Sequence, residues 1–402
     1  MPETLRVLTL NCWGIPYFSS DIPARFEAIG TELCTGRYDV VSLQEVWSQD
    51  VYEKMVSQVQ DVLPYHHYFY RYWDLCHFSV LHSGWHGSGV CIFSKHPIVG
   101  AYQYRFTLNG FPHKPHHPDW YGGKLAGLCQ IRHPGAEINV YATHTHTEYN
   151  HENDKDKAHR VSQAFELSQF IRYTGQSADV NILAGDLNNQ PFELGLKIIQ
   201  ANSGMEDAWL TAEHKNADDS GLTWNLDDNV YTCYPDYPPC RYDYVLYKGS
   251  ARCRMKCVHC ETTMHKVPGK PHNYSDHEGV LAHLELEKVS GQRQVQSAGP
   301  DQSERDAALR HAVHVLEERI SSSASSRLFY TSIILISLLL MLLSNWLHLH
   351  HLLTSLTHLL LGLLIGWSFW MGVVVMEMER RGCLATKAGM EVLLNASPKK
   401  NV

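Results

Sequence analysis

The sequence lacks an excess of basic residues. Its 402 residues contain 34 Lys and Arg against 42 Asp and Glu, which gives a formal net charge of −8 at pH 7. A protein that binds a polyanion uses Lys and Arg to neutralise phosphates, so this charge gives no support to a nucleic-acid partner. No nucleic acid is therefore expected among the partners.

The N-terminus lacks the pattern of a secretory signal peptide. Residues 1–10 continue directly into a strand-like run, without a basic segment or a separate apolar stretch. The eleven cysteines, an odd number, show no disulfide-framework spacing, which indicates a reduced, cytosol-facing domain. Cys253, Cys257 and Cys260 with His259 imitate the spacing of a metal site. Side chains along one strand fall on opposite faces, however, and zinc is not predicted there.

Two long stretches near the C-terminus lack any acidic or basic side chain. They run from about 328 to 347 and from 352 to 376, and each has the roughly 20 apolar residues that span a bilayer. Arg327 precedes the pair and Arg380 and Arg381 follow it, whereas the turn between them has no Lys or Arg. The positive-inside rule then places both termini in the cytosol. The short turn and modest spans suit the endoplasmic reticulum, with the Golgi or plasma membrane as alternatives.

Changes in composition divide the chain into five segments. The expected organisation is a catalytic domain at 1–287, a linker at 288–306, an amphipathic juxtamembrane helix at 307–325, two transmembrane helices within 326–376 and a cytosolic tail at 377–402.

Polar side chains end several strand-like runs in the first segment. They are Asn11, Glu45, His144, His146, Asp186, Asn188, Asp243, Asp276 and His277, with Asp243 inside its run. Each one alone could be a turn or a capping residue. Together, in an α/β pattern, they indicate one site, because the ends of strands are where a sheet collects functional groups.

These residue types suit metal-assisted hydrolysis of a phosphate ester. Glu45 and Asn11 offer the hard oxygen ligands that Mg²⁺ prefers. His277 can take a proton from the attacking water, with either Asp243 or Asp276 orienting its ring. We expect Asp276 to join the metal ligands.

Two further residues can stabilise charge on the phosphate. Asn188 can donate to a non-bridging phosphate oxygen. His144 can stabilise the pentacovalent centre or protonate the leaving alkoxide.

The ordered motifs LNCWG, LQEVW, THTH, GDLN, RYDYVL and SDH resemble the endonuclease/exonuclease/phosphatase superfamily, which includes DNase I-like nucleases. The resemblance covers residues 5 to about 285. It implies a four-layer α/β sandwich, in which two face-to-face mixed sheets are flanked by helices. It also implies that the matching residues form the site: Asn11, Glu45, His144, Asp186, Asn188, Asp243, Asp276 and His277.

Other motifs favour one branch of this superfamily. Inositol polyphosphate phosphatases have a Trp before GDxN and a Cys-Asp-Arg later, where this chain reads LAGDLNN and RYDYVLY. NCWGIP, FSKHPI, AHRVSQAFELSQFI and SDHE, together with the apolar hairpin, resemble the membrane-anchored Mg²⁺-dependent neutral sphingomyelinases. That resemblance implies Mg²⁺ as cofactor, with Mn²⁺ as a substitute. It also implies hydrolysis of sphingomyelin, or of another choline phospholipid, at a lipid bilayer.

Three alternatives stay open. The same site could serve a phospholipase C that acts on lysophosphatidylcholine or lyso-platelet-activating factor, because the sequence does not show an acyl-chain pocket. A nuclease and a non-catalytic membrane scaffold are less well supported.

The segment DWYGGK contains an Asp-Lys pair, Asp119 and Lys124, at a spacing that the resemblance links to positioning of the catalytic region. Gly122 and Gly123 would let the backbone approach a phosphate, and Lys124 supplies a positive charge. A hairpin turn with a solvated Lys is the alternative. The hypothesis is that Lys124 contacts the substrate phosphate or pairs with Asp119.

Two histidines complete the candidate substrate-binding group. His146 falls on the same face as His144 if the strand continues. His159 lies in an expected helix, where a structural histidine is the commoner outcome, and the resemblance raises its rank. The aromatic stretch 64–87 could enter the headgroup region, surround a choline cation or pack on the sheets as a loop.

Overall fold

The computed structural model describes residues 3–70, 83–84, 86–114, 116–151, 153–234, 236–289, 302–346 and 350–396. The chain divides into two compact units, Met1–Ala308 and Leu309–Val402.

The first unit contains two mixed sheets of six strands each. The first sheet has the order β11–β12–β1–β2–β4–β3, formed by Cys253–Thr263, Gly279–Lys288, Glu3–Asn11, Val40–Gln44, Cys91–Ser94 and Tyr65–Tyr68. The second has the order β5–β6–β7–β8–β10–β9, formed by Ile98–Arg105, Leu125–His133, Ala136–His144, Val180–Asp186, Asp243–Gly249 and Glu206–Asp207.

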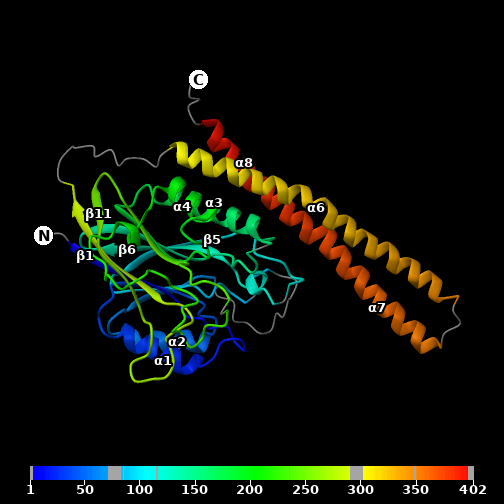
Figure 1. Ribbon diagram of the computed structural model, residues 1–402, viewed down its shortest axis with the longest axis horizontal. Coiled ribbons are helices and arrows are strands. Elements are labelled where there is room, and N and C mark those ends of the chain that lie inside the picture. Colours follow the sequence, from blue (N-terminus) through cyan, green and yellow to red (C-terminus); the bar gives the residue numbers. More distant parts are fainter. Residues whose placement is uncertain are drawn as a thin grey trace. The chain divides into compact units, whose positions relative to one another are not determined.

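Helices flank the two sheets on opposite sides, as Figure 1 shows. Helices α1 (Ile22–Leu33) and α2 (Gln49–Val59) lie beside the first sheet, and α3 (Lys157–Thr174) and α4 (Leu194–Ser203) beside the second. The short helices η1 and α5 occupy Pro118–Trp120 and Ala208–Thr211. The predicted four-layer α/β sandwich is confirmed.

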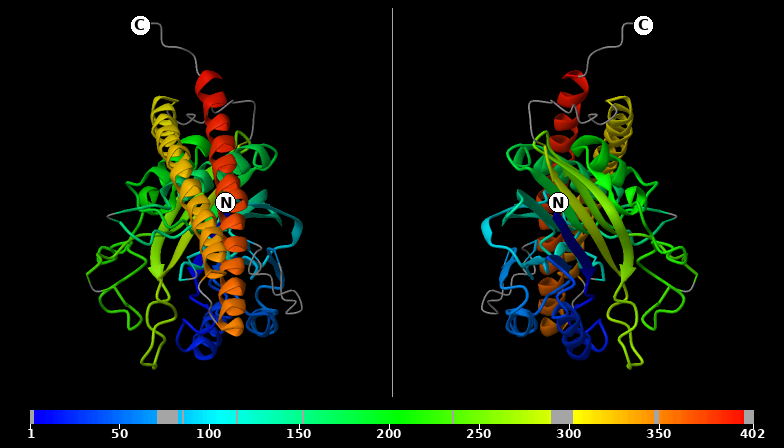
Figure 2. Two further views of the ribbon diagram at one scale, coloured as in Figure 1. Left: turned by 90° about the vertical axis from the view of Figure 1, so that its right-hand side faces the viewer. Right: turned by 90° about the vertical axis from the view of Figure 1, so that its left-hand side faces the viewer.

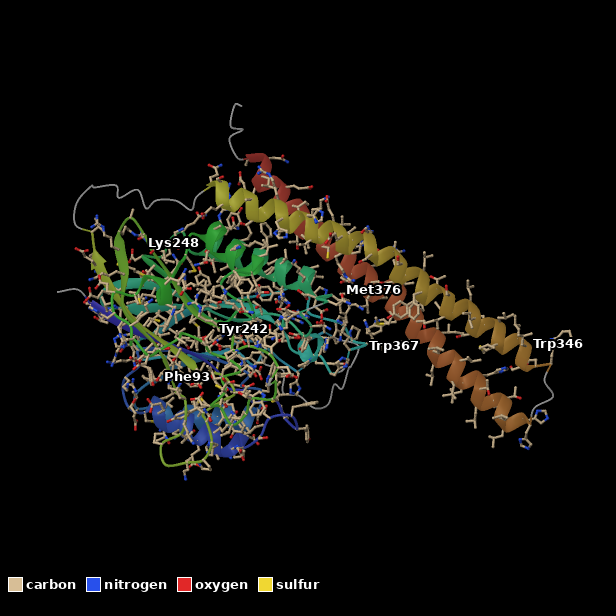
Figure 3. All side chains as sticks on the ribbon, viewed as in Figure 1. Phe93, Tyr242, Lys248, Trp346, Trp367 and Met376 are labelled. Atoms are coloured by element: carbon tan, nitrogen blue, oxygen red, sulfur yellow. The ribbon has the colours of Figure 1, made fainter. Side chains whose placement is uncertain are left out.

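The alternation of side chains along β1 explains how the first sheet is buried on both faces. Leu5 and Val7 belong to the apolar core between the sheets, whereas Leu8 and Leu10 pack with α1 and α2. Phe93 of β4 lies in the latter layer (Figure 3). From Val7 to Asn11 every residue of β1 is buried, including the polar Thr9, as expected for a strand that is covered on both faces.

Two parallel pairs of strands bring the polar strand ends together. In the first sheet β1 runs parallel to β2, with Asn11 opposite Gln44. In the second sheet β7 runs parallel to β8, with His144 opposite Asp186. Asp243, the first residue of antiparallel β10, also pairs with Asp186. The carboxyl ends of β1, β2, β7 and β8 therefore bring polar residues to one end of the sandwich.

The second unit is formed by helices. Helix α6 spans Gln302–Ser344, and α7 (His351–Phe369), the π-helical η2 (Trp370–Val375) and α8 (Met376–Ala396) return beside it (Figure 2). Two helical stretches, Gln302–Ser344 and His351–Ala396, are long and apolar enough to cross a membrane. Trp346 lies near the turn between them (Figure 3). Their apolar side chains are largely exposed, including Leu335 and Leu363.

The helices extend further than the sequence segments suggested. The expected amphipathic helix at 307–325 and the first apolar block form one continuous helix, since no Gly or Pro interrupts residues 302–346. Residues 376–396 of the expected tail are also helical. Arg319 binds Glu379 through two contacts of 2.6 and 2.8 Å, and Lys387 lies 2.8 Å from Glu317. These pairs join α6 and α8 beyond the apolar stretches. Of the expected linker, residues 290–301 lie outside the described residues.

Candidate active site

A cavity of about 350 Å³ opens at the carboxyl ends of the central strands. It is lined by nine of the predicted site residues: Asn11, Glu45, Asp119, Lys124, His144, Asp186, Asn188, Asp276 and His277. A larger depression of about 730 Å³ lies at the other end of β1, beside Glu3, and is lined by surface residues without this chemistry. The strand ends thus form the candidate active site.

Asn11 joins the two sheets across the floor of this cavity. Its amide Nδ2 donates to Glu45 Oε1 at 3.2 Å and to Asp186 Oδ2 at 3.0 Å. Its Oδ1 accepts the backbone N–H of Trp13 at 3.0 Å. The residue therefore closes a local Asx turn and also orients two buried carboxylates from different sheets.

Glu45 has the features of a carboxylate that binds a cation. Its backbone adopts φ 59°, and a side chain at Gly14 would meet the Glu45 carbonyl oxygen at 2.3 Å, so that a glycine is required there. Its Oε2 is buried and makes no hydrogen bond within the described part of the chain. Burial and the nearby carboxylate of Asp276 raise the pKa of Glu45 to about 7. A bound divalent cation would satisfy this oxygen and offset the repulsion, so the donor set fits one.

His277 and Asp243 form a buried pair beside Glu45. Asp243 Oδ2 lies 2.8 Å from His277 Nδ1. Burial opposes the imidazolium, but the carboxylates of Asp243 and Asp276 outweigh it and raise the pKa of His277 to about 10. With Nδ1 donating to Asp243, Nε2 is the ring atom that can exchange a proton with substrate or water.

His144, Asp186 and Asn188 complete the second-sheet side of the site. His144 Nε2 lies 3.4 Å from Asp186 Oδ2, and burial followed by the charge of Lys124 lowers the pKa of His144, which keeps the ring neutral. Asp186 Oδ1 accepts the backbone N–H of Asn188 at 2.9 Å. Asn188 has φ 42° and donates through Nδ2 to the Thr145 carbonyl oxygen at 3.0 Å. Both strained residues, Glu45 and Asn188, thus follow strands that end at the cavity.

The Asp-Lys pair is formed in the structure. Lys124 Nζ lies 3.3 Å from Asp119 Oδ1 and donates to the Thr145 carbonyl oxygen at 3.1 Å. The Tyr149 hydroxyl donates to the other carboxylate oxygen of Asp119. Both members of the pair are buried, so the alternative of a solvated Lys is wrong.

Comparison with known proteins identifies the fold and the family. Residues 8–277 match the model of the Endonuclease/Exonuclease/phosphatase family. The chain belongs to the endonuclease/exonuclease/phosphatase family.

Two relatives and one solved structure are similar to this chain. A Caenorhabditis elegans protein described as a candidate neutral sphingomyelinase is 35% identical over 97% of this chain and 91% of its own length. Mouse sphingomyelin phosphodiesterase 2 is 39% identical over 70% of this chain and 65% of that protein. A Staphylococcus aureus beta-toxin variant crystallised with bound magnesium ions has a TM-score of 0.53 at 22% identity, covering 70% of this chain and 99% of that one.

Three of the twelve candidate residues do not line the cavity: Asp243 contacts His277, which does, and the other two lie apart. His146 and His159 do not line it, although with Asp156 they form a buried group whose ligand atoms lie within 4.8 Å of one another. The Gly110 N–H donates to His159 Nδ1 at 3.1 Å, so the neutral ring has its proton on Nε2 and cannot offer that atom to a metal. Asp156 is also bound by Lys114 at 2.9 Å. We interpret this group as a network of side chains that supports Asp119 rather than as a metal site.

A second group of possible metal ligands lies inside the family site. Asp186, Asp243 and His277 have ligand atoms within 4.8 Å of one another. The sequence assigned all three to catalysis and placed the metal at Glu45, Asn11 and Asp276. The structure therefore provides acidic groups on both sides of His277.

Sequence reasoning missed the side chains that loops contribute to the cavity. Glu148, Tyr149, Trp224 and Tyr242 all line it. Only Glu148 and Tyr149 had a usable signal, because they follow THTH by two and three residues. Within the aromatic stretch 64–87, residues 71–82 and 85 lie outside the described residues, so the hypotheses for that stretch stay predictions.

Proposed function

We propose that this chain is a Mg²⁺-dependent phosphodiesterase that hydrolyses sphingomyelin to ceramide and phosphocholine at the cytosolic leaflet of a membrane. The observation that carries the proposal is that one cavity is lined by His277, which is paired with the buried Asp243, and by Glu45, whose Oε2 makes no hydrogen bond among the described residues. The names of the two relatives and the apolar helices of the second unit support the lipid substrate.

The proposed cation site is centred on Glu45, with Asp276 and Asn11 beside it. Glu45 is buried and Asp276 is half-buried, and the charge of Asp276 raises the pKa of Glu45, an arrangement that a divalent cation relieves. When bound, Mg²⁺ supplies positive charge against the phosphoryl oxygens, and Mn²⁺ is expected to substitute for it. The magnesium ions in the related beta-toxin structure support this choice.

His277 is the proposed general base, in the neutral form that a cation held by Glu45 and Asp276 would favour by offsetting the carboxylate charge that raises its pKa. Its Nε2 takes a proton from the attacking water while Asp243 holds Nδ1–H and stabilises the imidazolium that forms. Asn11, Asp186 and Asn188 hold the floor of the cavity in place through the hydrogen bonds between the two sheets.

His144 and Lys124 are the proposed groups that meet the phosphate and the leaving alkoxide. Neutral His144 has an Nδ1 atom that is buried and without a hydrogen-bond partner among the described residues. In the tautomer that has its proton on Nδ1, rather than on the Nε2 atom beside Asp186, the ring can donate to the developing charge or to the departing ceramide oxygen. Lys124, held by Asp119, adds a fixed positive charge at the same cavity.

The two apolar helices are proposed to tether the catalytic unit to its insoluble substrate. Tethering raises the effective concentration of the enzyme at the bilayer. The basic residues that flank the apolar stretches, Arg327, Arg380 and Arg381, support a cytosolic catalytic unit, and we propose the endoplasmic reticulum as its membrane.

The test is a direct comparison of three substrates with the full-length chain. Sphingomyelin, lysophosphatidylcholine and plasmid DNA are assayed with Mg²⁺, with EDTA, and with Mn²⁺ added back. We expect sphingomyelin to be cleaved fastest, EDTA to abolish the activity and Mn²⁺ to restore it. Faster release of phosphocholine from lysophosphatidylcholine would assign the lysophospholipase C alternative, and plasmid nicking would assign a nuclease.

Replacement of Lys124 by Ala is expected to lower kcat/KM for sphingomyelin by about 100-fold, since a charge held against a phosphoryl group is worth a few kcal/mol. Lys124→Ala also leaves Asp119 buried without its cation, which destabilises the fold. The double variant Lys124→Ala/Asp119→Asn separates the two effects. If the double variant regains full kcat/KM, Lys124 acts only through Asp119 and does not contact the phosphate.

A further inference from the structure

One wall of the cavity is aromatic and lies directly beside His277. The ring centroid of Trp224 lies 5.5 Å from that of Tyr242, 5.6 Å from that of Tyr234 and 6.4 Å from that of His277. These four side chains all line the cavity. A group bonded to a phosphate at His277 would therefore lie against aromatic side chains.

The backbone holds the Trp224 indole in this place. Trp224 exchanges two backbone hydrogen bonds of 3.0 Å with Cys240 and forms a β-bridge to His277, and the Glu278 N–H donates to the Thr223 carbonyl oxygen at 2.7 Å. The loop that contains Trp224 is thus attached to the same backbone that positions the proposed base. A ring fixed in this way is a preformed surface for a ligand.

Glu148 brings negative charge to the same wall. Its side chain is 7% exposed and lines the cavity. Its Oε2 makes no hydrogen bond within the described ranges, although His151 Nδ1 lies 2.9 Å from it, and Arg160 lies 3.6 Å away. The His151 ring stacks on Tyr237, and Tyr237 lies 5.8 Å from Trp224, which connects Glu148 to the aromatic wall.

The positive charge near Glu148 is shared among several carboxylates. Arg160 lies 2.8 Å from Asp154 and 3.4 Å from Glu193 in addition to its contact with Glu148. One guanidinium therefore faces three acidic groups. Burial raises the pKa of Glu148 and of Glu193 and lowers that of His151. Even with Lys157, whose charge also acts on Glu148, the acidic side chains of this corner outnumber its Lys and Arg side chains.

We propose that Trp224, Tyr242 and Glu148 form a subsite for a quaternary ammonium group, which selects lipids with a phosphocholine headgroup. The inference rests on the proposed function and adds the residues that choose the headgroup. A trimethylammonium group is weakly hydrated and has no N–H to donate, so π faces and a carboxylate oxygen without a hydrogen bond among the described residues suit it. A polyhydroxylated headgroup such as inositol is strongly hydrated and gains less from π faces than a quaternary ammonium does.

The test compares headgroups in one lipid background with the full-length chain in Mg²⁺. Sphingomyelin and inositol phosphoceramide are presented in identical mixed micelles. Glu148→Gln is expected to raise KM for sphingomyelin about tenfold with kcat within about twofold, and to leave the constants for inositol phosphoceramide unchanged. Trp224→Leu should do the same, whereas Trp224→Phe, which keeps a π face, should recover most of the loss.

Asp154→Asn is the matched control for charge. Asp154 shares Arg160 with Glu148 but does not line the cavity, so its removal disturbs the same ion cluster without touching the subsite. It should keep the headgroup preference of the wild type. An equal loss of preference in Asp154→Asn and Glu148→Gln would overturn the inference.

A binding measurement separates failure of the subsite from failure of the proposed function. Phosphocholine and inorganic phosphate are titrated calorimetrically against the wild type and against Glu148→Gln. The subsite requires that phosphocholine bind the wild type about tenfold more tightly than phosphate does, and that Glu148→Gln abolish this difference. A wild type that cleaves no sphingomyelin but shows this difference would remove only the proposed function. Equal affinities in the wild type would remove the subsite.

Discussion

A Glu45→Gln enzyme is expected to lose on the order of 1,000-fold in kcat on sphingomyelin while it keeps the fold. Gln preserves the size of the side chain and the contact with Asn11 but removes the negative charge that the proposed cation needs. The loss should persist at saturating Mg²⁺, and calorimetric titration should show weakened Mg²⁺ binding. Retention of most of the activity by Glu45→Gln would contradict the assignment of Glu45 as the main ligand.

The same substitution is expected to stabilise the metal-free protein. The folded-state pKa of Glu45 is about 7, against an ordinary value of 4.5, so folding binds a proton between these pH values. Stability therefore falls as pH rises through this window, and above pH 7 the cost is about 3 kcal/mol. In EDTA at pH 8, Glu45→Gln should unfold at a higher temperature than the wild type. Mg²⁺ should stabilise the wild type and leave the variant unchanged.

The carboxyl ends of strands were the part of the site that sequence could reveal. An apolar run that stops at Asn11, or an alternating one that stops at His144, predicts a polar side chain at the edge of a sheet. Which ends then face each other depends on strand order, and β1–β2 and β7–β8 meet only because two sheets stack. The motif resemblance, rather than residue patterning, supplied that stacking.

The sequence could not predict which loop residues line the cavity or in which register the strands pair, and the reason is physical. Asp243 was expected inside a strand and is the first residue of β10, opposite Asp186, a register that depends on tertiary pairing. Trp224 and Glu148 lie in irregular segments, where no periodicity marks the side that faces the cavity. In the second unit, the change from polar to apolar composition suggested a boundary near 326, but a helix continues through such a change when no residue breaks it.

His277→Ala is expected to lower kcat by about 10⁴-fold, at the upper end of the range for a general base. The loss is this large because, among the described residues, no other group that is paired with Asp243 can take the proton in place of His277. Asp243→Asn should cost about 100-fold, and the double variant should be no worse than His277→Ala alone, since the two residues act as one unit. Asp243 and Asp276 both raise the pKa of His277 above its ordinary value. Asp243→Asn should therefore move the acid limb of kcat/KM to lower pH, because a base with a lower pKa is already deprotonated there.

Asp207→Asn is the control, since Asp207 forms a buried ion pair of 2.7 Å with Arg241 and does not line the cavity. It should lower the unfolding temperature and leave the pH profile in place. Independent, multiplicative losses in His277→Ala and Asp243→Asn would mean that Asp243 serves another group, and the candidates are then His144 and the ligands around Asp186.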